Sequence, residues 1–241
     1  MTLSENRHFL IDSENLFEDV FILDGQEGHH AARVTHLKKG DSITLLKGNG
    51  FAYSAIVDEV AGDRIKGHIT KIIEDYNEPY IKIHLGIGIL KGVKLDTVVE
   101  KCTELGVYSI SILNLKNSVK KNTKLDRLES VSLAAIKQCG RGLKPSIRSC
   151  SLENWIGGSS GNARFVFHNG NNSKPFVNIF PSSINNENSI WIGIGPEGGF
   201  SKEELDALDK VSFKMVSLGQ RRLRSETAAI TSVGLIEQLI I

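Results

Sequence analysis

The chain has 241 residues, of which 40% are hydrophobic and 24% are charged, and its formal net charge at pH 7 is +1. These values predict one large or two modest domains with a real hydrophobic core, and they exclude a polycation. The three cysteines (Cys102, Cys139, Cys150) include no close pair, so they imply neither a disulfide framework nor a zinc cluster, and they fit a reducing cytoplasm. The sequence has no signal-peptide pattern and no apolar run near the roughly 20 residues of a membrane span.

The first part of the chain is predicted to form short strands. Residues rich in Val, Ile, Phe and Tyr occupy 17–23, 41–47, 51–60 and 64–73, with turn signals between them. A helical pattern interrupts them at about 26–37. Short strands at close spacing favour a small β-barrel. The polar segment that ends at Pro79 suggests a boundary, so we expect one domain over 1–76 and a second over 77–241.

The second part alternates strands with helices. Strands are expected at 81–90, 109–115, 164–168, 190–194 and 213–218, and helices at 94–105, 125–139, 201–208 and 225–239. The helix at 201 begins with a capping box, in which Ser201 is followed three residues later by Glu204. This alternation predicts an α/β domain with a mostly parallel sheet covered on both faces.

Charge is unevenly distributed between the two parts. Residues 1–76 carry a net charge of −5 and residues 77–241 a net charge of +6. Nine basic and two acidic residues fall within 114–148. Such a segment can form a basic surface that attracts a phosphate backbone, or simply a solvated helix face, and composition does not separate the two.

Two glycine-rich segments follow strands near the end of the chain, at 193–199 and 217–227. Glycines at a strand end let a ligand approach the bare backbone, so the two segments can build one pocket for a nucleoside-like cofactor. Gly193-x-Gly195-x-x-Gly198 also matches the dinucleotide fingerprint. That interpretation is disfavoured because Glu197 would meet the pyrophosphate, and because no acidic residue lies between Asp209 and Glu226 to bind the ribose.

These two segments carry a resemblance to a known family. They read Ile194-Gly195-Pro196-Glu197-Gly198-Gly199-Phe200-Ser201 and Leu218-Gly219-x-Arg221-x-Leu223-Arg224-x-Glu226-Thr227-Ala228. Both closely resemble the bacterial 16S ribosomal RNA (uracil-N3)-methyltransferases of the SPOUT class, and the resemblance extends over essentially the whole chain. The N-terminal part resembles that family's PUA-like domain through His30-x-x-Arg33-Val34 and Gly40-Asp41.

The resemblance implies a function as well as a fold. It implies a trefoil-knotted SPOUT domain after an RNA-binding PUA-like barrel, and a homodimer with its active site at the subunit interface. The expected reaction is transfer of a methyl group from S-adenosylmethionine to N3 of a uridine in 16S rRNA of the small ribosomal subunit. Neither the sequence nor the resemblance implies a metal. A SPOUT-like enzyme acting on tRNA or on another rRNA atom, and a non-catalytic RNA-binding protein, stay as alternatives.

The resemblance also assigns residues to the cofactor and the RNA. The expected cofactor contacts are His168, Gly193, Ile194, Gly195, Glu197, Gly198, Leu218, Gly219, Leu223, Arg224 and Thr227. His168 has the alternative role of a capping or core-edge histidine. The expected RNA contacts are Arg33, Lys38, Lys39, Lys116, Lys120, Lys121 and Arg141. A flipped base is expected, because N3 lies on the pairing edge of uracil.

Two charged residues are candidates for catalysis. Arg224 could stabilise the negative charge that develops on the uracil, and Glu197 could accept the proton from N3. Alternatively, Arg224 holds a phosphate and Glu197 ties down its own loop by accepting backbone N–H bonds. Three positions depart from the family pattern, at His36, Asn117 and Lys137, and they concern the RNA contacts rather than the cofactor pocket.

Overall fold

The fold is described from a computed structural model, which describes residues 7–119, 123–161, 163–170, 173–180 and 188–240. The chain divides into two compact units. Unit 1 consists of Met1–Glu78 with Leu133–Lys144, and unit 2 consists of Pro79–Ser132 with Pro145–Ile241. The sequence analysis did not anticipate that a segment from the second half of the chain belongs to unit 1.

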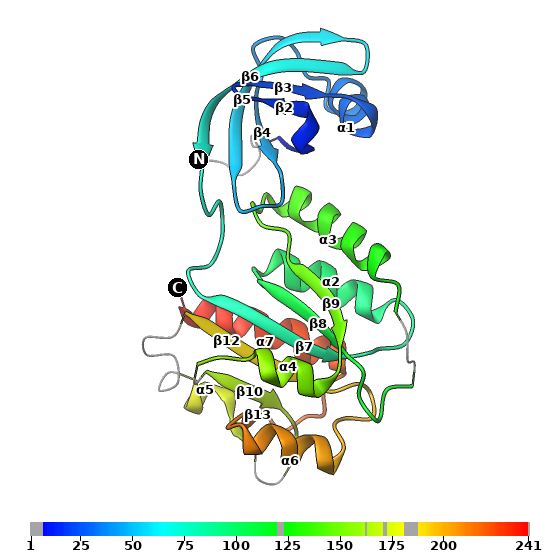
Figure 1. Cartoon of the computed structure of the whole chain (residues 1–241), viewed down its shortest axis with the longest axis vertical. Coiled ribbons are helices and arrows are strands. Elements are labelled where there is room, and N and C mark those ends of the chain that lie inside the picture. Colours follow the sequence, from blue (N-terminus) through cyan, green and yellow to red (C-terminus); the bar gives the residue numbers. More distant parts are fainter. Residues whose placement is uncertain (1–6, 120–122, 162, 171–172, 181–187, 241) are drawn as a thin grey trace. The chain divides into compact units, whose positions relative to one another are not determined.

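Unit 1 is built on a curled six-stranded sheet (Figure 1). Its strands, in spatial order, are β1 (His8–Leu10), β4 (Ser42–Leu46), β5 (Ala52–Ala61), β6 (Arg64–Ile73), β3 (Val20–Leu23) and β2 (Leu16–Phe17). Register shifts in the β5–β6 pair at Ser54/Ala55 and Val57/Glu59 bend the two longest strands. The expected helix at 26–37 forms α1 (Gly25–His29) and continues as a π-helical turn, His30–Val34.

Unit 2 contains a seven-stranded sheet in which every pair is parallel. In spatial order its strands are β11 (Lys174–Pro175), β13 (Lys214–Ser217), β10 (Arg164–Phe167), β12 (Ser189–Ile194), β7 (Lys82–Gly88), β8 (Ser109–Leu113) and β9 (Ser146–Cys150). Its helices are α2 (Lys94–Glu104), α4 (Leu152–Gly158), α5 (Phe176–Ile179), α6 (Lys202–Lys210) and α7 (Ser225–Ile240), with α3 (Leu125–Cys139) shared with unit 1. The predicted parallel α/β architecture is confirmed.

Helices cover both faces of the parallel sheet. On one face α2 and α7 bury Val98, Val99, Val233 and Ile236 against the strands. On the other face α4 and α6 pack in a separate cluster around the fully buried Trp155. The predicted capping box of α6 is present, because Ser201 Oγ accepts from the N–H of Glu204 and Glu204 Oε2 accepts from the N–H of Ser201.

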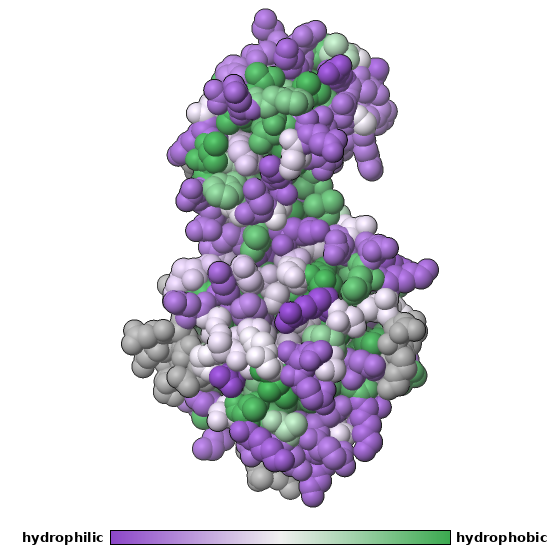
Figure 2. Space-filling model, in the orientation of Figure 1, coloured by the Kyte–Doolittle hydropathy of each residue, from purple (hydrophilic) through white to green (hydrophobic). Residues whose placement is uncertain are grey.

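Polar residues cover most of the visible surface of unit 2, with smaller apolar patches between them (Figure 2). Among the helices of the described residues, none is long and apolar enough to cross a membrane.

One half-buried histidine makes the stability of unit 2 depend on pH. The His84 ring stacks on Trp191 with ring centroids 4.1 Å apart, and its Nδ1 hydrogen-bonds Ser109 Oγ at 2.7 Å. Burial, with smaller contributions from Lys82 and Arg148, lowers the pKa of His84 from 6.5 to about 4. A base whose pKa is lower in the folded state stabilises the fold above its unfolded-state pKa and loses that contribution as the pH falls.

We therefore expect unit 2 to lose stability between pH 6.5 and pH 4, and we expect His84→Gln to flatten that part of the profile. Tryptophan fluorescence during urea unfolding measures this, because both tryptophans, Trp155 and Trp191, belong to unit 2. The same decline in His84→Gln as in the wild type would assign the pH dependence to other groups.

Candidate functional site

A cavity of about 670 Å³ opens at the carboxyl ends of three strands of the parallel sheet. Residues that follow β10, β12 and β13 line it, together with the start of α7. The lining residues are Lys94, Phe167, His168, Asn169, Ile194, Gly195, Pro196, Glu197, Gly198, Gly199, Phe200, Val216, Ser217, Leu218, Gly219, Arg221, Arg222, Leu223, Arg224, Ser225 and Ala228. Ligands of open parallel sheets bind at this edge.

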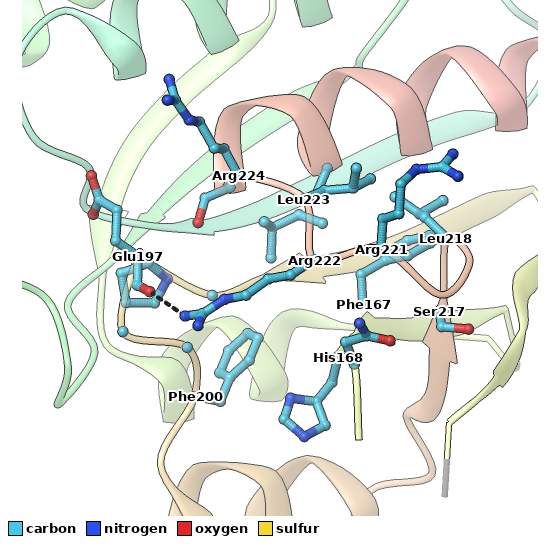
Figure 3. A pocket seen from close by; sticks show the side chains of 18 of the residues that line it. Phe167, His168, Glu197, Phe200, Ser217, Leu218, Arg221, Arg222, Leu223 and Arg224 are labelled. Atoms are coloured by element: carbon cyan, nitrogen blue, oxygen red, sulfur yellow. Dashed lines mark hydrogen bonds between the residues drawn. The ribbon is translucent and has the colours of Figure 1, made fainter. Parts of the chain in front are cut away.

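The strand order explains how the glycine-rich segments meet. β12 and β13 are not neighbours, because β10 lies between them and pairs with both. The chain after β10 therefore reaches the cavity between the two glycine-rich segments. His168 extends the pairing of β10 with β13, because its N–H donates to the carbonyl of Val216 at 2.9 Å. In Figure 3 the His168 side chain lies below Arg222 and beside Phe200.

The loop after β12 folds tightly on itself. A Cβ on Gly195 would lie 3.1 Å from the main chain of Gly199 and Phe200, which leaves little room for any side chain. Gly199 has a φ of +72°, and its N–H donates to the carbonyl of Pro196 at 2.8 Å. Glycine is required here because the turn needs a positive φ and the backbones approach closely.

One oxygen of the Glu197 carboxylate is engaged in holding this loop, whereas the other, Oε2, is buried and has no hydrogen-bond partner among the described residues. Glu197 Oε1 accepts from Lys94 Nζ at 2.9 Å and from the N–H of Lys91 at 3.3 Å. Partial burial raises the pKa of Glu197, but the hydrogen bonds from Lys94 and from backbone N–H groups outweigh burial and lower the pKa overall. A carboxylate with a lowered pKa is a weak proton acceptor, so this geometry favours the loop-anchoring alternative over general base catalysis.

Lys94 is a cavity residue that the sequence analysis missed. It is the first residue of α2, and its ammonium group also lies 3.9 Å from Glu226 Oε2 near the start of α7. One lysine thus connects the chain after β7 with two segments of the cavity wall. Its sequence signal is weak, because a lysine in the first turn of a helix is ordinary on a protein surface.

Asn117 connects the chain after β8 with the same loop. Its Nδ2 lies 3.2 Å from the carbonyl oxygens of both Gly198 and Gly199. A Cβ on Gly198 would lie 2.9 Å from Asn117 Cβ, so the two segments are in direct contact. Asn117, which departs from the family pattern, therefore supports the cavity wall. It also lies within the basic segment 114–148.

Three arginines of the segment between β13 and α7 line the mouth of the cavity. Arg222 extends across it, and its Nη2 lies 3.4 Å from the Glu197 carbonyl (Figure 3). Arg221 and Arg224 point in other directions in the same view, and all three side chains are exposed.

Most residues expected to contact the cofactor lie together at this cavity, namely His168, Ile194, Gly195, Glu197, Gly198, Leu218, Gly219, Leu223 and Arg224. Gly193 and Thr227 do not line it. Gly193 is buried, and a Cβ there would lie 3.3 Å from Trp155, so this glycine makes room for a core side chain. Thr227 is exposed on α7.

The residues expected to contact RNA have different environments. Lys38 and Lys39 are exposed, Arg33 is exposed and bonded to Asp63 at 2.8 Å, and Lys116 is exposed near Glu203. Lys120 and Lys121 lie outside the described residues.

The prediction that Arg141 contacts RNA needs correction. Its side chain is only 3% exposed and forms a double hydrogen bond with Glu78, so it holds unit 1 together and does not present a charge to a phosphate.

Lys137 and His36, the other two positions that depart from the family pattern, lie in unit 1. Lys137 Nζ bonds both carboxylate oxygens of Glu27, at 2.6 and 2.9 Å, so it holds α3 to α1. His36 is exposed with a φ of +54°. Within the part of the chain that the structure describes, no group of three or more His, Cys, Asp or Glu side chains is arranged to hold a metal ion.

Comparison with known proteins adds independent evidence. A model of the RNA methyltransferase domain matches residues 77–237, and a model of the RNA methyltransferase PUA domain matches residues 23–70. Ribosomal RNA small subunit methyltransferase E 2 of Borreliella burgdorferi is 30% identical over 96% of this chain and 97% of its own. Ribosomal RNA small subunit methyltransferase E of Bacillus subtilis is 26% identical over 95% of both chains.

A solved structure is similar over nearly the full length. It is that of a protein from Legionella pneumophila assigned as a methyltransferase, in complex with the cofactor S-adenosylmethionine. The identity is 26% and the TM-score 0.81, over 97% of this chain and 98% of the other.

Proposed function

This chain belongs to the RNA methyltransferase family, and we propose that it transfers a methyl group from S-adenosylmethionine to N3 of a uridine in 16S rRNA of the small ribosomal subunit. The observation that supports this most directly is the cavity at the carboxyl edge of β10, β12 and β13, formed by the two glycine-rich segments that carry the family resemblance. The relatives named for small-subunit rRNA support the choice of substrate. The choice of uracil N3 rests on the resemblance alone.

The cavity is suited to S-adenosylmethionine. Its volume of about 670 Å³ lies within the usual range of cofactor pockets, roughly 300–1,000 Å³. Apolar side chains (Leu218, Leu223) and bare peptide edges (Gly195, Gly219) suit an adenosine group. When bound, the cofactor supplies an electrophilic methyl group on a sulfonium.

The residues of the chain would then position the substrate and balance charge. N3 of uracil loses its proton during transfer, which leaves negative charge on the base. We retain Arg224 as the candidate cation for that charge, because it is an exposed residue of the cavity lining. We assign Glu197 to anchoring the loop after β12, because Lys94 and the N–H of Lys91 already engage its Oε1 and lower the pKa of its carboxyl group.

Substitution of Glu197 by glutamine separates loop anchoring from proton acceptance. The amide oxygen of Gln can still accept both hydrogen bonds without a charge, so we expect the donor Kd to rise about threefold to tenfold, in line with the difference between charged and neutral hydrogen bonds. Turnover at saturating donor should stay near the wild-type value. Calorimetry and single-turnover methyl transfer measure the two quantities, and Asp206→Asn on the exposed surface of α6 is the control. Normal donor binding with abolished turnover would restore Glu197 as the proton acceptor.

We also propose that the PUA-like unit binds RNA, that the protein is cytoplasmic, that unit 2 is trefoil-knotted, and that two copies form a homodimer. These proposals rest on the resemblance described above. Sedimentation at several protein concentrations tests the dimer.

The function itself is tested by mass-spectrometric mapping of methylated uridine in rRNA from cells with and without this protein. We expect one N3-methyluridine of 16S rRNA to disappear in the deletion strain and to return when small subunits are treated with purified protein and donor. Loss of a tRNA modification, or of a methyl group on another rRNA atom, would favour the corresponding alternative. Unchanged RNA together with no donor binding would favour a non-catalytic RNA-binding protein.

A further inference from the structure

The lining of the cavity carries an excess of positive charge. Lys94, Arg221, Arg222 and Arg224 line it, and Glu197 is the one acidic residue among the lining residues. Lys94 is balanced by Glu197 at 2.9 Å and by Glu226 at 3.9 Å. Among the described residues, no carboxylate lies within 4.0 Å of the guanidinium groups of the three arginines. The excess charge therefore belongs to the segment between β13 and α7.

This excess is not explained by the methyl donor. The donor carries a sulfonium and an ammonium group against a single carboxylate, so its net charge is positive, and one cation is enough to pair with that carboxylate. Three exposed arginines without carboxylate partners instead suit an anionic ligand that arrives at the mouth. Guanidinium groups bind phosphate through paired N–H donors, so a phosphate group of a polynucleotide matches this chemistry.

Arg222 occupies the decisive position among the three. It spans the mouth from one glycine-rich segment to the other (Figure 3), and its guanidinium donates a 3.4 Å hydrogen bond to the Glu197 carbonyl. This bond is long and has an uncharged acceptor, so little is lost when the guanidinium moves to a charged oxygen. Position 222 is not one of the residues that carry the family resemblance.

We propose that Arg222 binds a backbone phosphate of the RNA strand next to the target nucleotide. In free protein Arg222 rests on the Glu197 carbonyl, and on RNA binding it exchanges that contact for the phosphate. The inference rests on the proposed function, because it needs a single-stranded nucleotide at the cavity mouth. It adds an RNA contact beside the cavity, at a residue that the sequence analysis did not name among the RNA contacts.

The test compares Arg222→Gln and Arg222→Lys with the wild-type full-length protein in two assays. The first measures binding of an oligouridylate as a function of salt concentration, and the second measures binding of S-adenosylmethionine by calorimetry. For Arg222→Gln we expect oligouridylate binding to weaken about fivefold, and the plot of log K against log salt to become shallower by about 0.7, the value for one lost phosphate contact on a single strand. Arg222→Lys should recover most of the slope and leave donor affinity unchanged, and Arg222→Gln should leave donor affinity unchanged or slightly higher.

Lys210→Gln, at the exposed end of α6, removes one positive charge away from the cavity and should leave both measurements unchanged. An unchanged salt slope in Arg222→Gln, or a loss of donor affinity as large as the loss of RNA affinity, would overturn the inference and make Arg222 part of the pocket wall. Because oligouridylate binding needs no methyl transfer, this result is distinct from failure of the proposed function. Wild-type protein that binds oligouridylate with the expected slope but methylates no rRNA would overturn the function alone.

Discussion

Arg141→Met is expected to destabilise unit 1 by about 3–5 kcal/mol, because it leaves the carboxylate of Glu78 buried without its cationic partner. Arg141 is 3% exposed, and its Nε and Nη2 lie 2.9 and 2.7 Å from Glu78 Oε2. Burial raises the pKa of Glu78 despite the opposing hydrogen bonds from Arg141 and from the N–H of Leu143. The carboxylate is therefore already costly to bury, and removal of the guanidinium takes away most of its compensation.

Hydrogen exchange at the amides of β5 and β6 reports the stability of unit 1 separately from unit 2. Two further variants control the experiment. Arg64→Met, at an exposed arginine of the same unit, should change stability by less than about 0.5 kcal/mol. The double variant Arg141→Met/Glu78→Gln removes the orphaned charge but keeps an acceptor for the N–H of Leu143, so it should recover a large part of the loss. A loss below about 1 kcal/mol in Arg141→Met would show that the pair contributes little.

Arg141 and Lys94 show which features of the site could be predicted from the sequence and which could not. The basic segment 114–148 was recognisable from its charges, but a run of charges does not tell which side chains turn inward. Arg141 is held by Glu78, 63 residues earlier, and that contact depends on how the segment Leu133–Lys144 packs in unit 1. Lys94 lines the cavity because α2 starts beside the loop after β12, which is a consequence of strand order.

The glycine-rich segments were predictable for a different reason. Gly195 and Gly199 are needed for local backbone geometry, and local geometry is the kind of constraint that leaves a pattern in neighbouring residues. Gly193 shows the limit of that argument, because its missing side chain leaves room for both Val166 and Trp155, and Trp155 belongs to a helix that the sequence analysis did not predict. The strand β9 was also missed, since only Ile147 of its five residues is buried and its pattern is weak.

Gly88→Ala is expected to weaken donor binding, because Gly88 contacts the loop that forms part of the cavity wall. Gly88 ends β7, and a Cβ there would lie 2.5 Å from Pro196 Cδ and 2.6 Å from Pro196 N. Neither the proline ring nor its backbone can rotate away as a flexible side chain would. The loop after β12 must therefore shift as a unit, and with it Gly195 and Glu197, which line the cavity.

Overpacking of this kind costs about 1–3 kcal/mol, which corresponds to a loss of roughly fivefold to 150-fold in donor affinity if the strain is relieved by moving the loop. Calorimetric titration with S-adenosylmethionine measures the loss, and tryptophan fluorescence in urea shows whether unit 2 stays folded. Gly157→Ala is the matched control, because a Cβ at Gly157 meets no atom within 4 Å. If Gly88→Ala lowers the stability of unit 2 but leaves the donor Kd unchanged, then the strain is absorbed in the sheet, and the position of Pro196 does not control the cavity. Weakened binding at preserved stability would instead show that the packing of β7 against this loop sets the shape of the site.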